Sequence, residues 1–276
     1  MPATEQQEMT FLEHLEALRW HLVRSILAVA VIAAGAFIFK DIIFNHILIA
    51  PKTPDFITNR TLCSLGNLIG IRALCINSEP FQLININMAG QFTTHIMVSF
   101  FVGIILAFPY LVFEMWRFIS PALYDKEKNY ARGGVFYVSL LFLLGIVFAY
   151  FVIIPLSVHF LGSYSVSHEV INQINLLSYI TTVSSIALAA GLIFELPVLI
   201  FILSKLGLVT PEFLKKYRRH ALVIVLALSA IITPPDVFSQ ILVAFPLMFL
   251  YEIGIRISRK IVMEQNTVIQ KSEREQ

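Results

Sequence analysis

Residues 180–203, ITTVSSIALAAGLIFELPVLIFIL, decide the class of fold. These 24 residues contain one ionisable side chain, Glu195. A helix of about 20 mostly apolar residues crosses the hydrocarbon layer of a bilayer, which is about 30 Å thick. The stretch therefore predicts a membrane-spanning helix with a carboxyl group inside it.

Five more apolar runs lie along the chain, and none has the alternating pattern of a β-barrel strand. They cover residues 22–39, 96–113, 133–154, 221–232 and 237–255. Helices are expected here because they satisfy every backbone polar group within one segment. The run 221–232 amounts to only about 18 Å of helix at 1.5 Å per residue. A tight turn, Thr233-Pro234-Pro235-Asp236, joins it to the last run, so this hairpin either spans a thinned bilayer or enters and returns on one side.

The composition supports a membrane protein. Of 276 residues, 57% are hydrophobic and 14% charged, and the mean hydropathy is +0.78, whereas soluble domains have roughly 45–50% and 25%. We expect an all-α polytopic membrane domain over residues 1–260, with six transmembrane helices of which the last two are short. The polar tail 261–276 is expected to be disordered.

Three prolines within the spans, Pro109, Pro197 and Pro246, favour a bent, concave bundle, although proline is also common in ordinary membrane helices.

The basic residues indicate the orientation of the chain. Sixteen of the 20 lysines and arginines lie in the N-terminal segment, the second and fourth connections and the C-terminal tail, whereas the first connection holds four. With six spans, this distribution places both termini in the cytoplasm. The N-terminal segment lacks the pattern of a cleavable signal or transit peptide. The residues alone do not separate a bacterial membrane from an organellar one, but the lack of a transit peptide favours a multi-pass protein of the bacterial cytoplasmic (inner) membrane. No basic aromatic patch indicates binding to nucleic acid.

The sequence lacks the motifs of covalent catalysis and metal binding. No H-E-x-x-H, G-x-S-x-G, P-loop or Cys/His ligand cluster occurs, so we expect no enzyme activity, no cofactor and no metal. Intramembrane ionisable groups are instead typical of channels and transporters. Placing the Glu195 carboxylate inside the bilayer costs roughly 2.5–3.5 kcal/mol, so the side chain should face protein, water or a partner helix. Alternatively, it is protonated and serves only to pack two spans together. Thr233 and Gln240 add polarity near the hairpin turn.

The only two cysteines, Cys63 and Cys75, fall in the long outer connection between Lys40 and Asn87. In an oxidising compartment they form either a disulfide that closes a small loop or two unpaired thiols. The residues alone leave both possibilities open.

The inner face carries acidic residues among basic ones. The amphipathic stretch from His14 to Arg19, HLEALR, leads into the first span. The second connection, residues 116–128, reads WRFISPALYDKEK. Its carboxylates are suited to an arginine-bearing ligand, because guanidinium pairs with carboxylate bidentately. Alternatively, Asp125 and Glu127 pair with neighbouring lysines at the surface, where such pairs contribute little.

Taken together, these segments resemble TatC, the multi-spanning subunit of the twin-arginine protein translocase, from Phe11 to about Arg259. Each motif is weak alone, but the set is highly specific. The motifs are HLEALR at 14–19, Pro109 with WRFISPALY at 116–124, FAYF at 148–151 before Pro155, FELP at 194–197, and TPPDVFSQ at 233–240.

The resemblance implies a six-span, glove-shaped bundle that recognises signal peptides bearing paired arginines. Such a protein acts with single-span partners of the TatA and TatB type to export folded proteins, driven by the proton motive force. We also expect a homo-oligomer within a larger complex in the lipid bilayer.

Family roles transfer by position. Glu127 matches the acid that binds the arginine pair, and Arg19 and Phe118 match residues that shape the receptor site. Glu195 matches a polar residue of the concave face, and Gln240 matches one near the contact with a partner helix.

The sequence departs from the family pattern at one important position. The family usually has H-L-x-E-L-R, but here Ala17 stands where the acid is expected and Glu16 precedes it. A shift of one residue rotates a side chain by about 100° around a helix. We expect Glu16 to take this role, with Glu13 as the other candidate.

Two other functions stay open from the residues alone. A small ion-coupled transporter would use Glu195 as its proton carrier. A purely structural scaffold would bind neither a signal peptide nor a small solute.

Overall fold

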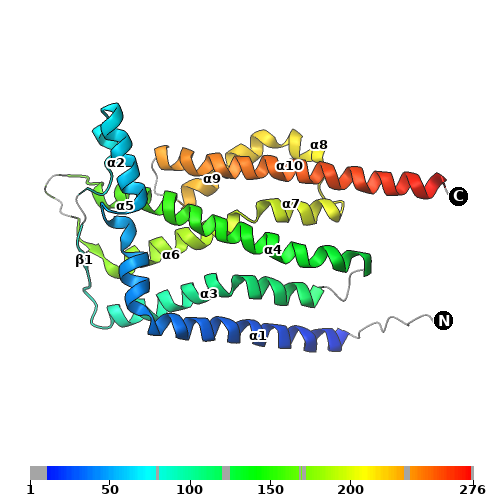
Figure 1. Ribbon diagram of the computed structural model, residues 1–276, viewed down its shortest axis with the longest axis horizontal. Helices are drawn as coiled ribbons and strands as arrows, with labels where there is room; N and C mark the ends of the chain where they lie inside the picture. Colours follow the sequence, from blue (N-terminus) through cyan, green and yellow to red (C-terminus); the bar gives the residue numbers. More distant parts are fainter. Residues whose placement is uncertain are drawn as a thin grey trace. The chain divides into compact units, whose positions relative to one another are not determined.

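The computed structural model describes residues 11–78, 81–119, 125–167, 169, 172–232 and 237–274. Within these ranges, side chains are described except those of residues 11–14, 119, 125–132, 231–232, 237–239, 265–266 and 268–274. Nearly all of this part of the chain is helical (Figure 1).

The elements follow one another in a simple order. They are α1 (Phe11–Ile38), the π-helix η1 (Ile42–Leu48), the 3-10 helix η2 (Ala50–Lys52), α2 (Ile57–Ile69), the 3-10 helix η3 (Arg72–Leu74), β1 (Leu83–Ile84), α3 (Gly90–Ile119), α4 (Asp125–Phe148), the π-helix η5 (Ala149–Ile153), α5 (Ile154–Ser163), β2 (Ile174–Asn175), α6 (Leu176–Ile193), α7 (Leu196–Lys205), α8 (Pro211–Lys216), α9 (Arg218–Ile232) and α10 (Val237–Arg274). The chain divides into two compact units, Met1–Lys40 with His95–Leu140 (unit 1) and Asp41–Thr94 with Leu141–Gln276 (unit 2).

Five helical stretches in the described part are long and apolar enough to cross a membrane. They are Leu15–Ile38, Gly90–Phe118, Gly133–Ser163, Leu176–Lys205 and Gln240–Glu264. The predicted fold class, an all-α polytopic membrane protein, is confirmed. The apolar run 221–232 forms the end of α9, which at 15 residues is about 22 Å long and is the short helix expected there.

The C-terminal region differs from the expectation. We predicted a short last helix and a disordered tail from residue 261, but α10 has 38 residues and continues to Arg274. The residues after the apolar run include many glutamates, lysines, glutamines and arginines, which have high helix propensity and extend a helix that is already anchored by packing.

The three prolines within the predicted spans differ in whether they interrupt a helix. Pro109 and Pro246 lie inside continuous helices, α3 and α10. Pro197 lies in the first turn of α7, and the chain is interrupted just before it, at Phe194 and Glu195. The break follows from the proline, because its ring removes a backbone donor and clashes with the preceding turn.

In unit 1, α1 and α3 approach closely through small residues. A Cβ atom on Gly103 of α3 would lie 2.9 Å from both Cβ of Ala33 and the carbonyl oxygen of Val29 on α1. Small residues permit such approach between membrane helices, where van der Waals contact replaces the hydrophobic effect. Further along the same pair, the His95 ring stacks on Phe37 at 3.8 Å between ring centroids.

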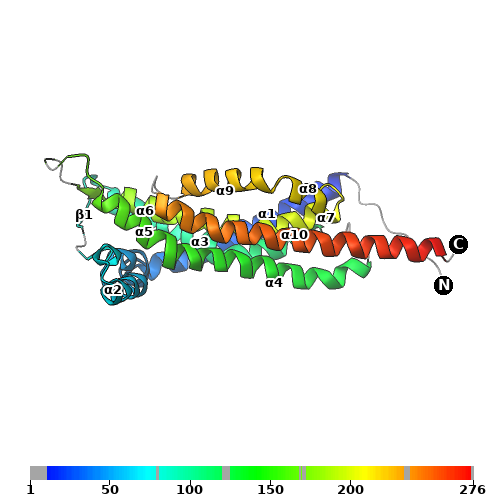
Figure 2. The ribbon, with the colours of Figure 1, turned by 90° about the horizontal axis from the view of Figure 1, so that it is seen from above.

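In unit 2, α7 and α10 run side by side (Figures 1 and 2). The Ser204 hydroxyl donates to the Ser258 hydroxyl at 2.8 Å, with both side chains fully buried. A Cβ atom on Gly254 would lie 2.4 Å from the Cδ1 atom of Ile200. Two residues before Gly254 on α10, a carboxylate oxygen of Glu252 lies 2.7 Å from Arg218 Nε of α9.

The end of unit 2 away from the C-terminus holds the long first connection. Two-residue strands pair there in parallel, with Leu83 opposite Ile174. The buried Asn77, which has a positive φ of 52°, donates its amide to the carbonyl oxygens of Pro51 and Pro155. These bonds attach the connection to α5.

The contact between α4 and α6 yields a test of the packing. A Cβ atom on Gly145 would lie 2.7 Å from the carbonyl oxygen of Ala190. Overpacking of this kind costs about 1–3 kcal/mol, so Gly145→Ala should lower the thermal unfolding midpoint in detergent. The control is Gly134→Ala in the same helix, where a Cβ meets nothing within 4 Å and the higher helix propensity of alanine should maintain or raise the midpoint. Equal midpoints for the two variants would contradict this packing.

Candidate functional site

A carboxylate lies buried between α1 and α3 in unit 1. Glu114 of α3 is 2% exposed. The Tyr110 hydroxyl donates to its Oε1 atom at 2.8 Å, and His21 Nδ1 of α1 donates to its Oε2 atom at 2.5 Å. Arg24 Nη1 lies 3.9 Å from the same Oε2 atom. The carboxylate thus has a hydrogen-bond donor from its own helix and two basic side chains from the other helix.

Helical spacing places these groups together. Tyr110, Glu114 and Phe118 are four residues apart on one face of α3, and His21 and Arg24 are three apart on α1. The His21 ring also meets the Phe118 ring edge-on, at 5.9 Å between centroids. We call these five residues the Glu114 cluster.

Sequence analysis missed the Glu114 cluster. Glu114 lies one residue beyond the apolar run 96–113, so run length gives no sign that its carboxylate is buried. Its main partner, His21, is 93 residues away in the chain. The available signal was the spacing of Tyr110, Glu114 and Phe118 opposite that of His21 and Arg24, but a single sequence does not show which helices are neighbours.

Two predicted site residues lie on the exposed part of α1. Glu16 and Arg19 pair with each other at 3.6 Å, and both side chains are about two-thirds exposed. The Arg19 guanidinium also lies 5.5 Å from the centroid of Trp20. This solvated pair is weak, because exposed ion pairs contribute about 0–1 kcal/mol.

Glu127, the predicted acid of the second connection, lies in the first turn of α4. Its side chain is outside the described residues. Ser120 to Tyr124, which precede α4 in the same motif, are also outside them, as is the side chain of Glu13.

Glu195 occupies the break between α6 and α7. Both carboxylate oxygens are buried, and no described group satisfies the geometry of a hydrogen bond to them. The backbone of Phe142 on α4 faces the carboxylate. The neighbouring Phe194 ring packs on Phe148 at 5.5 Å. Among the described residues, Glu195 is therefore a carboxyl group in a largely apolar setting.

Gln240 lies near the start of α10 and points to α9. Its Nε2 atom donates to the carbonyl oxygen of Leu226 at 3.0 Å. Because α9 is short, this bond joins the two helices of the hairpin close to their connection. Thr233, the other polar residue predicted there, lies outside the described residues.

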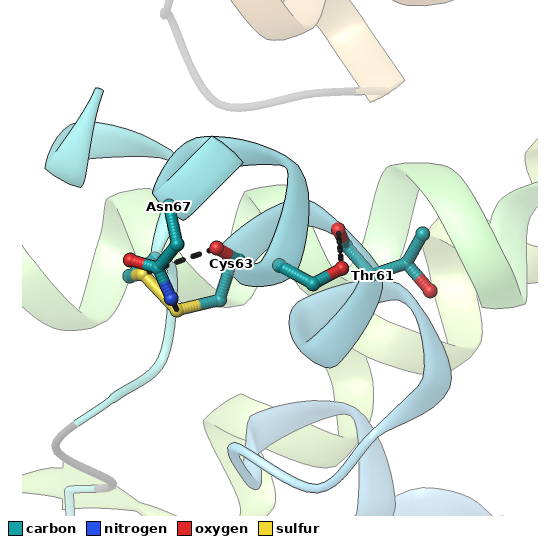
Figure 3. Close-up of a disulfide and its surroundings, with 5 residues drawn as sticks. Thr61, Cys63 and Asn67 are labelled. Carbon is teal, nitrogen blue, oxygen red and sulfur yellow. Dashed lines mark hydrogen bonds between the residues drawn. A yellow bond between two sulfur atoms is a disulfide. The ribbon is translucent and has the colours of Figure 1, made fainter. Parts of the chain in front are cut away.

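Cys63 and Cys75 form a disulfide that joins α2 to the residue after η3 (Figure 3). Asn67, one turn further along α2, lies beside the disulfide, with its Nδ2 atom 4.0 Å from Cys63 Sγ. The bridge closes the small loop between residues 63 and 75.

These features define a class: an all-α polytopic membrane protein with ionisable groups buried in its candidate spanning helices. The family model described as "Sec-independent protein translocase protein (TatC)" matches residues 13–246. The chain is 40% identical, over 256 residues, to "Sec-independent protein translocase protein TatC" of Blattabacterium sp. subsp. Periplaneta americana (strain BPLAN), with 92% of this chain and 96% of that protein covered. It is 34% identical, over 266 residues, to the protein of the same name from Aquifex aeolicus (strain VF5), with 96% and 100% covered.

Solved structures agree with these relatives. The structure described as "Crystal Structure of Twin Arginine Translocase Receptor- TatC" matches with a TM-score of 0.66 and 33% identity, and covers 91% of this chain and 100% of that one. The structure of the same receptor "in DDM" gives a TM-score of 0.66 and 32% identity, with 90% and 100% covered. The chain belongs to the TatC family, which confirms the resemblance drawn from its motifs. It is a multi-pass membrane protein and a component of the Sec-independent protein translocase, with a role in protein transport.

The Glu114 cluster leads to a prediction about stability. Glu114→Ala would leave His21 and Tyr110 without their acceptor, and an unsatisfied buried polar group costs about 1–3 kcal/mol. We expect a clear fall in the thermal unfolding midpoint in detergent. Glu114→Gln keeps the size and one oxygen acceptor, so its midpoint should lie between those of the parent and Glu114→Ala. An unchanged midpoint in Glu114→Ala would show that the cluster does not hold α1 to α3.

Proposed function

We propose that this chain is the signal-peptide receptor and core scaffold of the twin-arginine translocase. It binds signal peptides with paired arginines at its cytoplasmic face and organises TatA-like and TatB-like single-span subunits. The assembly contains several copies of this chain and exports folded proteins across the bacterial inner membrane with the proton motive force. The distribution of basic residues supports cytoplasmic termini.

One observation carries the proposal. Of the receptor-site positions with described side chains, Glu16 and Arg19 lie near the start of α1 and Phe118 lies near the end of α3, where it contacts His21, two residues after Arg19 on α1. His21 is in turn bonded to the buried Glu114 of α3, which joins the two helices at this end of the pair. Family membership over residues 13–246 supports the assignment of these positions.

The acidic residues supply the attraction for arginine. Glu127 is the principal ligand in this proposal, since a guanidinium forms two parallel hydrogen bonds with one carboxylate. Glu16 is available as a second ligand, because its present partner is held only loosely, at 3.6 Å and in solvent. An arriving arginine can therefore replace Arg19 at Glu16 with little loss of binding energy.

Glu195 serves a different step, contact with a partner helix. A carboxyl group buried without a well-formed hydrogen bond is unfavourable, and no described group meets hydrogen-bond geometry at Glu195, although the backbone of Phe142 faces it. A polar side chain from a single-span subunit would relieve this cost. Gln240 and Thr233 provide further polar groups for a partner helix, at the α9–α10 connection.

Charge reversal at Glu127 tests the receptor assignment. Glu127→Lys should abolish photo-crosslinking to a twin-arginine signal peptide, because it puts a cation where two guanidinium groups bind. The matched control is Asp125→Lys, the same change two residues earlier, which should retain most of the crosslinking. Membrane insertion, measured by carbonate extraction, should be equal for both. Undiminished crosslinking in Glu127→Lys would remove this residue from the site.

The buried carboxyl of Glu195 also favours the second candidate function, an ion-coupled transporter. The two readings differ in liposomes that contain only this chain. The transporter would take up protons with a small solute, and Glu195→Gln would stop it. The receptor should show no such uptake, while Glu195→Gln retains signal-peptide crosslinking and weakens crosslinking to TatA-like or TatB-like subunits. Proton-coupled solute uptake by the parent chain would decide for the transporter.

A further inference from the structure

The helix α2 in the first connection is amphipathic and has an uncovered apolar face. Ile57, Leu65, Leu68 and Ile69 fall within one third of the helix circumference at 100° per residue. Each is exposed, Leu68 by 82% and Ile69 by 62%. Large side chains in this arrangement indicate a surface that contacts something apolar.

The opposite face of α2 is polar and holds the helix in place. The buried Asn59 donates its amide to the carbonyl oxygens of Pro51 and Thr53. Gly66 lies so close to the next segment that a Cβ there would meet the carbonyl oxygen of Ile71 at 2.6 Å. The disulfide of Cys63 is on this side too, as Figure 3 shows with the adjacent Asn67. These attachments determine which face of α2 is left free.

The depth of α2 follows from its contacts at the first turn. The Thr58 hydroxyl donates to the backbone carbonyl of Phe151 at 2.5 Å, and the Phe56 ring stacks on the Phe151 ring at 5.7 Å between centroids. Phe151 lies within the candidate span Gly133–Ser163 and near the end of the apolar run 133–154. The start of α2 is therefore level with the end of a hydrocarbon-spanning segment, not beyond it.

The direction of α2 completes the argument. Figure 1 shows α2 running across the long helices of unit 2, at the end of the unit away from the C-terminus of α10, and Figure 2 shows it nearly end-on. A helix at this depth and in this direction lies along the bilayer surface. Arg60, exposed at the edge of the apolar face, is placed for the phosphates of lipid headgroups.

We propose that α2 is an interfacial helix whose apolar face enters the boundary between lipid headgroups and acyl chains. The occupant of this face is the bilayer, because α2 adjoins a spanning segment at the level where lipid begins. Amphipathic helices of this kind bury their apolar face about 5–10 Å into that boundary. The proposal goes beyond receptor function and does not depend on it.

Site-specific photo-crosslinking tests this surface. The full chain carries p-benzoylphenylalanine at Leu68 or, as the matched control, at Asn67 on the polar face, and is reconstituted in vesicles of phosphatidylethanolamine and phosphatidylglycerol. We expect lipid adducts by mass spectrometry at position 68 with a yield at least five times that at position 67. The label at Ile69 repeats the test at a second apolar position, which keeps the experiment decisive if one variant folds poorly.

Three results would overturn the proposal. Equal lipid yields at positions 67 and 68 would show that α2 has no lipid-facing side. Adducts from position 68 to a second copy of this chain would assign the face to self-association, and adducts to a TatA-like or TatB-like subunit added to the vesicles would assign it to that partner.

Discussion

A carboxyl group inside an apolar helix has to find its hydrogen-bond donors within protein, because the bilayer core supplies no water. Among the residues that the structure describes, this constraint separates two acids with buried carboxylates, Glu114 and Glu195. Glu114 accepts hydrogen bonds from its own helix and from α1. These bonds offset the free-energy cost of burying its carboxylate, and they join the two helices. No described group meets the geometry of a hydrogen bond to the Glu195 carboxylate, although the backbone of Phe142 faces it, so its burial is costly unless it is protonated or a further polar group reaches it. The same residue type thus joins two helices in one case and is left without a hydrogen bond of good geometry in the other.

Close backbone contacts hold the helices together where side chains are small. Gly103, Gly145 and Gly254 each bring two helices nearer than a Cβ atom would allow. In lipid, exposed leucine and isoleucine side chains cost nothing, so there is little hydrophobic drive for helices to associate. Association then rests on van der Waals contact and on interhelical hydrogen bonds such as Ser204 to Ser258. This explains why so many large apolar residues stay on the surface of the protein.

The spans were predictable from sequence, whereas most of the contacts within the site were not. The length of an apolar run depends on one segment only, so residues 180–203 indicated a span, and Pro197 a bend in it, without knowledge of the neighbouring helices. Glu114 could not be recognised in this way, because its meaning depends on His21, 93 residues away. The length of α10 was underestimated because its predicted end was taken from the end of the apolar run. Hydropathy shows where a helix leaves the lipid, but a helix can continue beyond that point, as α10 does to Arg274. Family motifs pointed to Arg19 and Phe118, but only the structure shows the imidazole of His21 against the Phe118 ring.

The position of the acid on α1 changes the chemistry of the receptor proposal. Residues two apart on a helix do not face each other, whereas residues three apart do. An acid at position 17, as the family pattern has it, would not pair with Arg19, but Glu16 does so at 3.6 Å. In this chain the acid of α1 is thus partly neutralised before any ligand arrives, and its attraction for an incoming arginine is reduced. Capture in this protein should accordingly rest more heavily on Glu127, with Glu16 engaged only after Arg19 has been displaced.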